Sequence, residues 1–250
     1  MKWVKNFYEK QYSLFEADRP ETGIDSYHRD LVSKLEKHAH HPLNTMLELG
    51  AGTGEVAMAA AQKGYDVTAV ELVPKLVNKM KEIQTNDRFK GNFTPICGDF
   101  YDIEHRITYD LVYYLDGFGV GSDHDQKRLL HRINNWLKPD GCALIDIYTP
   151  WYWSKHAGQE MHFNRFSRKY DYDFIAARML DTMWSNSTPE SITQTLRCYT
   201  PADLNMLLEN TGLKMVDIIP GGSFNYKTWE YKEQVSLDES MSYMAKLEKI

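Results

Sequence analysis

Apolar and polar positions alternate along residues 44–150 in a rhythm that predicts strands and helices in turn. Short, almost continuously apolar runs are typical of strands buried on both faces of a sheet. Such runs lie at residues 45–49, 66–71, 92–97, 109–115 and 142–148. Segments with apolar residues at helical spacing separate them, at residues 54–63, 74–84 and 125–137. This order predicts an α/β fold with a doubly wound, mostly parallel sheet.

Turn and capping residues support these boundaries. Ser122 and Asp125 have the spacing of a capping box, in which each side chain accepts a backbone N–H at the start of a helix. Pro74 is favourable in a first helical turn. Residues 138–141, Lys-Pro-Asp-Gly, predict a turn before the strand at 142–148.

The rest of the chain is expected to add to this core. Residues 1–43 have aromatic side chains at roughly helical spacing and predict a helical lid. Residues 151–200 are rich in aromatic and basic residues and predict an inserted antiparallel β cap. Its candidate strands are 163–170, 174–184 and 191–199. Residues 201–250 begin with a helix and contain two strands, 213–219 and 242–248, which would complete a seven-stranded sheet around the core of residues 44–150.

Composition narrows the class of protein. The chain has 250 residues, 42% of them hydrophobic, a net charge of −6 and a pI near 5.9, which argues against a nucleic-acid-binding protein. Its three cysteines are far apart, which argues against a disulfide framework or a cysteine metal site and favours a reducing, cytoplasmic location. No apolar run is long enough to span a membrane, and the N-terminus lacks the apolar segment of a signal peptide. A monomer and a homodimer are both compatible with these features.

The most informative motif follows the first strand. Residues 46–54 read Met-Leu-Glu-Leu-Gly-Ala-Gly-Thr-Gly, and a helical run begins at once. A dinucleotide-binding fold requires Gly-x-Gly-x-x-Gly, with the third glycine at position 55. Position 55 is Glu, and the third glycine is Gly54. This form resembles the first motif of the class I, Rossmann-like methyltransferases that depend on S-adenosylmethionine (SAM), of the small-molecule type.

The resemblance implies a set of cofactor-binding residues. Gly50, Ala51 and Gly52 would approach the methionine part of SAM, with Glu48 oriented toward its ammonium group. At the ends of the next two strands, the resemblance places side chains that would bind the nucleoside: Glu71 for the ribose hydroxyls, Leu72 for the adenine ring, Asp99 for the adenine amino group and Phe100 for a ring contact. Leu115 would face the sulfonium, and Tyr12 would close over the cofactor from the N-terminal helix.

Fewer features of the sequence indicate which residues would bind the molecule that accepts the methyl group. Asp116, after the fourth strand, and Tyr148, at the end of the fifth, are the best-placed catalytic candidates. Trp151, Tyr152 and Trp153 would supply aromatic walls to the substrate pocket, and His162 a base. Two other interpretations stay open: these rings belong to the core of the cap, and basic residues near 165–169 recognise an acidic acceptor. No metal is expected, because Asp116 and Asp146 do not form a carboxylate cluster.

The sequence therefore predicts a transferase that moves the methyl group of SAM to an N or O nucleophile of a small molecule. Such a displacement needs positioning and water exclusion rather than a covalent protein intermediate. Three alternatives remain at this point. One is a protein or RNA methyltransferase, another a SAM-binding protein without catalysis. The third is an NAD(P)-dependent oxidoreductase, which Glu55 disfavours.

Overall fold

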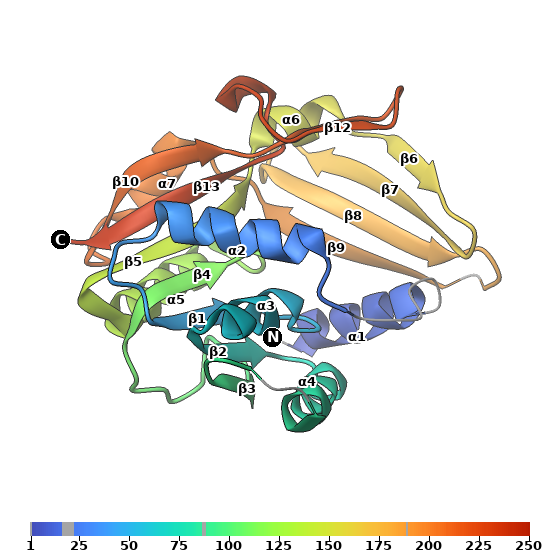
Figure 1. Cartoon of the computed structure of the whole chain (residues 1–250). Coiled ribbons are helices and arrows are strands. Elements are labelled where there is room, and N and C mark those ends of the chain that lie inside the picture. The colour runs from blue at the N-terminus through green and yellow to red at the C-terminus, as the bar shows by residue number, and fades with distance from the viewer. Residues whose placement is uncertain (1, 17–22, 87–88, 189) are drawn as a thin grey trace.

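The centre of the molecule is a seven-stranded sheet (Figure 1). The computed structural model describes residues 2–16, 23–86, 89–188 and 190–250. The strand order is β10-β13-β5-β4-β1-β2-β3. These strands are β1 (Thr45–Leu49), β2 (Asp66–Glu71), β3 (Phe93–Cys97), β4 (Tyr109–Tyr114), β5 (Leu137–Tyr148), β10 (Leu213–Pro220) and β13 (Ser242–Lys249). β13 runs antiparallel to both of its neighbours, β5 and β10, and the other adjacent strands are parallel, so the predicted doubly wound, mostly parallel sheet is confirmed.

Helices cover both faces of this sheet. They are α2 (Ser26–His38), α3 (Glu55–Lys63) and α4 (Pro74–Asn86) on one face, and α5 (Asp123–Trp136) and α7 (Pro201–Leu208) on the other. Successive strand residues point to opposite faces. Met46 accordingly packs in the core cluster beneath α2 and α3, whereas Leu47 packs in the cluster beneath α5 and α7. The predicted helices are confirmed to within two residues at each end.

The sequence predicted the start of α5 correctly but not the start of β5. The capping box of Ser122 and Asp125 is present as predicted. The strand that we expected at 142–148 begins at Leu137 instead. Tyr109 pairs with Leu137 and Leu111 with Cys142, so residues 138–141 bulge out of the ladder rather than form a turn before it.

The predicted insertion is an antiparallel sheet of four strands in the order β6-β7-β8-β9, here called the cap sheet. It follows a short helix, α6 (Pro150–Lys155), and comprises β6 (Gln159–His162), β7 (Phe166–Asp173), β8 (Arg178–Ser185) and β9 (Ser191–Arg197). The sequence interpretation missed β6 and α6, and it began β8 too early because residues 174–177 form a turn. It also missed the hairpin of β11 (Ser223–Asn225) and β12 (Glu230–Lys232) and the short helix η1 (Leu237–Glu239).

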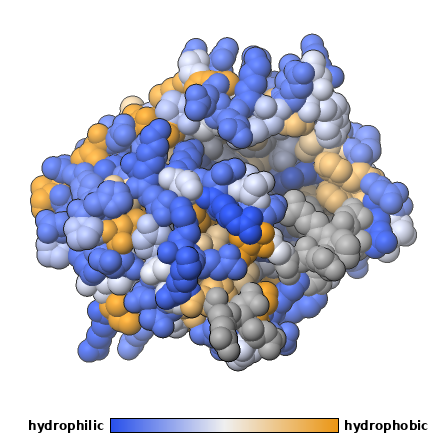
Figure 2. Space-filling view, viewed as in Figure 1, coloured by the Kyte–Doolittle hydropathy of each residue, from blue (hydrophilic) through white to orange (hydrophobic). Residues whose placement is uncertain are grey.

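The N-terminal helix α1 (Lys2–Glu16) lies against β9 of the cap sheet (Figure 1). Val4 packs in a cluster with cap residues, and the Gln194 side-chain amide donates to the Tyr8 hydroxyl at 2.7 Å. In the same view the molecular surface is hollowed between α2 and the cap sheet (Figure 2). No helix in the described ranges is long and apolar enough to cross a membrane.

Candidate active site

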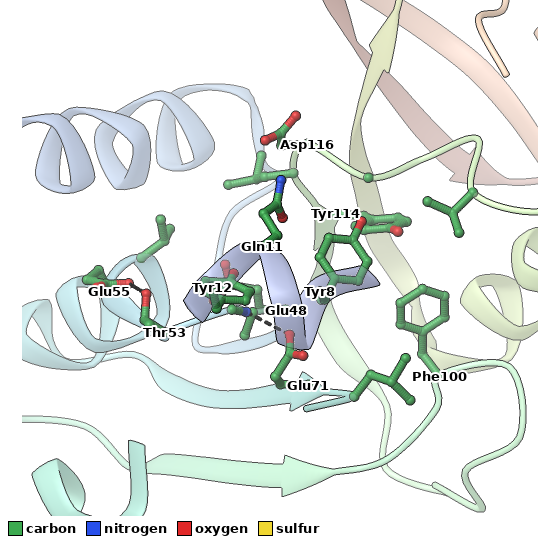
Figure 3. Close-up of a pocket in the computed structure, with 18 of the residues that line it drawn as sticks. Tyr8, Gln11, Tyr12, Glu48, Thr53, Glu55, Glu71, Phe100, Tyr114 and Asp116 are labelled. Carbon is green, nitrogen blue, oxygen red and sulfur yellow. Dashed lines mark hydrogen bonds between the residues drawn. The ribbon is translucent and has the colours of Figure 1, made fainter. Parts of the chain in front are cut away.

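A cavity of about 420 Å³ opens at the carboxyl ends of the central strands, between the glycine loop, α1 and the cap sheet. In open α/β sheets this edge is where ligands bind. The structure brings all ten sequence-predicted cofactor residues to its wall. They are Tyr12, Glu48, Gly50, Ala51, Gly52, Glu71, Leu72, Asp99, Phe100 and Leu115. Figure 3 labels Tyr12, Glu48, Glu71 and Phe100 among them. Asp116, a predicted catalytic residue, lines the same cavity.

The glycine loop joins β1 to α3 in a conformation that suits glycine. Gly50, Gly52 and Gly54 have φ angles of 65°, 58° and 84°, in the left-handed region. A Cβ on Gly52 would lie 2.3 Å from the Tyr12 hydroxyl, because α1 packs its tyrosine directly over the loop. The loop thus has a backbone conformation that favours glycine, and Tyr12 packs closely against it. Together they form a narrow cradle for a ligand.

The Glu71 side chain is buried at the end of β2 and held by two backbone groups. Its Oε2 accepts the N–H of Gly52 and its Oε1 accepts the N–H of Val73, both at 2.8 Å. Burial raises the pKa of Glu71, and the backbone hydrogen bonds oppose that rise. The carboxylate is therefore fixed in place, and each oxygen retains a lone pair for a hydroxyl donor.

Glu48 lies deeper in the same wall and is only 4% exposed. The Tyr113 hydroxyl donates to its Oε2 at 3.2 Å. Burial raises the pKa of Glu48 to about 8, and the nearby carboxylates of Glu55 and Glu71 add to the rise. A cationic group bound here would favour the ionised form.

Asp99 and Phe100 form the far wall beyond β3. Oδ1 of Asp99 accepts the N–H of Tyr101 at 2.9 Å, which orients the carboxylate. The Phe100 ring meets Tyr114 edge-on, with centroids 5.3 Å apart. A planar ligand between these walls would contact an aromatic face and a fixed acceptor.

Asp116 marks the other side of the cavity. It follows β4 with φ of 53°, and its Oδ1 accepts a hydrogen bond from the Tyr148 hydroxyl. The surrounding residues keep water from the Asp116 carboxylate and so raise its pKa. The hydrogen bond from Tyr148 and the charge of Arg168 oppose the rise. Arg168 of β7 reaches the cavity wall, and its Nε donates to Oδ1 of the buried Asp181 at 2.7 Å. The two predicted catalytic residues are thus in direct contact, although Tyr148 itself is not part of the cavity wall.

The predicted aromatic wall lies elsewhere. Tyr152 and Trp153 are buried against the C-terminal segments: the Tyr152 hydroxyl donates to the Phe224 carbonyl at 2.8 Å, and Trp153 Nε1 donates to the Met241 carbonyl at 3.0 Å. Trp151 packs at the edge of the same cluster. Consecutive residues on a helix point about 100° apart, so three neighbours in α6 cannot all face one pocket. His162 is also outside the cavity; it is largely exposed and contacts Ser167.

Sequence reasoning missed several residues of the cavity wall, namely Tyr8, Gln11, Glu55, Tyr101 and Tyr114. The sequence did indicate two of them. Residues 8, 11 and 12 have the i, i+3, i+4 spacing of a single helix face, so Tyr8 and Gln11 are expected beside Tyr12. Tyr27 and His28 of α2 line the cavity as well. Within the described ranges, no group of three His, Cys, Asp or Glu side chains could hold a metal ion.

Comparison with known proteins identifies the core. Residues 46–141 match the family described as a methyltransferase domain. Residues 46–141 are therefore a methyltransferase domain. The domain and its flanks are 31% identical over 143 residues to the cypemycin N-terminal methyltransferase of a Streptomyces species. That alignment covers 52% of this chain and 56% of the relative, so the chain spans little more than half of the relative's length.

Solved methyltransferases share the fold over most of the chain. The CcbJ methyltransferase from Streptomyces caelestis superposes with a TM-score of 0.71, at 18% identity and 89% coverage of both chains. A SAM-dependent methyltransferase from Clostridium acetobutylicum superposes with a TM-score of 0.69, at 14% identity, covering 97% of this chain and 98% of that one. The likeness extends well beyond residues 46–141 and includes regions outside the methyltransferase domain.

SAM, the cofactor of this domain class, fits the cradle described above. Gly50 and Gly52 line the cavity without a side chain, so a ligand can approach their backbone, and the buried Glu71 offers a fixed pair of acceptor oxygens. Glu48 could receive the ammonium group, and Asp99 with Phe100 the adenine. The residues present are therefore compatible with SAM.

Proposed function

We propose that the chain transfers the methyl group of SAM to an N or O nucleophile of a small molecule. One observation carries the proposal. A single cavity contains the carboxylates suited to the cofactor, Glu48, Glu71 and Asp99, together with Asp116 on the opposite side. Donor and acceptor would therefore meet in one enclosed space, as an in-line displacement requires.

The residues around this space have distinct roles in the proposal. Glu71 binds the ribose hydroxyls, and the glycine loop and Glu48 bind the methionine part of the cofactor. Asp116 faces the acceptor, Tyr148 orients Asp116 through its hydrogen bond, and neither forms a covalent bond to the acceptor. Tyr12 covers the cofactor from α1, which serves as the lid, while the cap sheet closes the acceptor side.

Size and charge support a small acceptor. A volume of about 420 Å³ lies within the range of roughly 300–1,000 Å³ that is usual for small-molecule sites. The net charge of −6 disfavours a nucleic-acid substrate. The relative named above acts, by its name, on the N-terminus of cypemycin, which is consistent with a nitrogen acceptor. We also infer a cytoplasmic location from the three free cysteines.

Calorimetry with S-adenosylhomocysteine and an acceptor screen that detects its release test the proposal. We expect saturable binding of S-adenosylhomocysteine, no binding of NAD(P), and turnover with at least one small molecule. Binding without turnover on small molecules, proteins or RNA would favour a non-catalytic SAM-binding protein. Stabilisation by NAD(P) alone would refute the proposal.

A further inference from the structure

The cavity is rich in acidic side chains. Its wall contains five carboxylates: Glu48, Glu55, Glu71, Asp99 and Asp116. The Arg168 charge on the same wall is matched by the buried Asp181, which binds both Nε and Nη2 of the guanidinium. Since the charge of Arg168 is offset within the cap sheet, the cavity as a whole favours a cationic ligand.

Asp116 stands apart from the carboxylates suited to the cofactor. In Figure 3 its side chain lies on the far side of Tyr8 and Gln11 from Glu71. Its backbone N–H donates to the carboxylate of Asp146, and its Oδ1 accepts the Tyr148 hydroxyl. The first contact fixes the backbone of Asp116, and the second orients its carboxylate. Within the described residues no donor contacts Oδ2, so this oxygen is available to a ligand in the cavity.

Aromatic faces accompany this carboxylate. Tyr8 and Tyr12 of α1, Tyr27 of α2 and Tyr114 of β4 all line the cavity. A cation near a carboxylate gains further attraction from the faces of such rings. An anionic acceptor would find no such attraction here.

A hydroxyl acceptor would need different machinery. Alcohols require a general base to remove the proton during attack, and histidine is the usual one. Among the described residues of the cavity wall, the one histidine is His28. Its Nδ1 lies 2.7 Å from Oδ1 of Asp25 in the capping box of α2. An amine needs only to lose its extra proton before it attacks, which a carboxylate can accept.

We infer that the acceptor is an amine, protonated in solution, whose nitrogen is bound by Oδ2 of Asp116 among the tyrosine rings. This inference rests on the proposed function and specifies its substrate class. The ammonium group passes one proton to Asp116 and becomes a neutral amine. SAM supplies an electrophilic methyl group: the N–C bond forms as the C–S bond breaks, and sulfur keeps the electron pair. Asp116 then releases its proton to solvent, so one proton leaves per methyl transferred.

The test is a thermal-shift and calorimetric screen of the protein saturated with S-adenosylhomocysteine. Its probes are alkyl, arylalkyl and sugar amines, each paired with the alcohol and the carboxylate of the same carbon skeleton. We expect at least one amine to bind, about tenfold or more tighter than its paired alcohol, and no paired carboxylate to bind as tightly.

Asp116→Asn is the matched variant, because asparagine tolerates the left-handed backbone at this position and retains an acceptor for Tyr148. It should weaken amine binding about tenfold or more and leave the affinity for S-adenosylhomocysteine within about twofold. Asp238→Asn, at an exposed carboxylate in η1, should change neither.

The outcomes separate the two proposals. Equal binding of alcohols, binding of no amine, or full amine affinity in Asp116→Asn would overturn the amine assignment, provided that S-adenosylhomocysteine binds normally. Failure of the wild-type protein to bind S-adenosylhomocysteine would instead refute the proposed function, and the amine assignment with it.

Discussion

Oε2 of Glu71 lies 2.8 Å from the backbone nitrogen of Gly52, so one carboxylate joins the end of β2 to the glycine loop after β1. Its other oxygen accepts the N–H of Val73, at the start of the next helical segment. The group that we assign to the ribose therefore also fixes the loop around the methionine part of the cofactor. Loss of Glu71 should affect both halves of the cofactor site.

Glu71→Ala should weaken the binding of S-adenosylhomocysteine by about tenfold or more, because hydrogen bonds to a charged group are lost at a buried position. Isothermal titration calorimetry measures the change. Glu82→Ala, at an exposed position of α4, is the control and should bind normally. An affinity within about twofold of wild type in Glu71→Ala would mean that the ribose lies elsewhere.

Gly52→Ala should reduce both stability and cofactor affinity. The substitution costs roughly 1–2 kcal/mol for the left-handed backbone and adds a contact with the Tyr12 hydroxyl, 2.3 Å from the new Cβ. Tyr12→Phe removes that hydroxyl, so the double variant should regain part of the loss but not the backbone cost. Urea unfolding of the two single variants and the double variant measures the coupling. Strictly additive effects would show that α1 does not press on the loop in solution.

Tyr8→Phe should destabilise the contact between α1 and the cap sheet. It leaves the amide of the largely buried Gln194 without its acceptor, at a cost of about 1–3 kcal/mol in unfolding free energy. The double variant Tyr8→Phe with Gln194→Leu should recover much of that loss, since both polar groups are then absent. Thermal unfolding of the wild-type protein, Tyr8→Phe, Gln194→Leu and the double variant checks this. If Tyr8→Phe alone were neutral, the helix would not be docked by this hydrogen bond.

The sequence predicted the central sheet, and its ten cofactor candidates line one cavity, for a physical reason. Strands buried on both faces read as continuous apolar runs, and the glycine loop and strand ends combine local geometry with chemistry. In contrast, β6 places only Met161 in the core, and the short strands β11 and β12 lie largely at the surface. Such segments carry no apolar pattern that sequence reasoning could detect.

The acceptor side depends on tertiary contacts that no local pattern records. Arg168 and Asp181 meet because of the register between β7 and β8, which pairs Arg168 with Met183 and Tyr170 with Asp181. That register follows from the turn at residues 174–177, where the sequence suggested a strand. The error over Trp151, Tyr152 and Trp153 has a similar origin. We expected these three rings on one wall of the pocket, but they lie on a helix and point in three directions.

Glu48 predicts a pH dependence of stability. In the unfolded chain its carboxyl ionises near the ordinary pKa of 4.5, whereas burial raises its pKa to about 8 in the folded protein. Between these values folding takes up a proton. The stabilising contribution of Glu48 is therefore fully present below about pH 4.5 and is lost as the pH rises through about 8.

Glu48→Gln removes this titration, because glutamine stays neutral at every pH. We expect its unfolding free energy to be similar to that of wild type near pH 5 and to exceed it by about 1 kcal/mol or more near pH 9. Urea unfolding across this range measures the difference, and Glu239→Gln, at an exposed position, should run parallel to wild type. A constant difference between Glu48→Gln and wild type would show that Glu48 ionises normally. S-adenosylmethionine should reduce the difference near pH 9, because its ammonium group would favour the ionised carboxylate that burial alone disfavours.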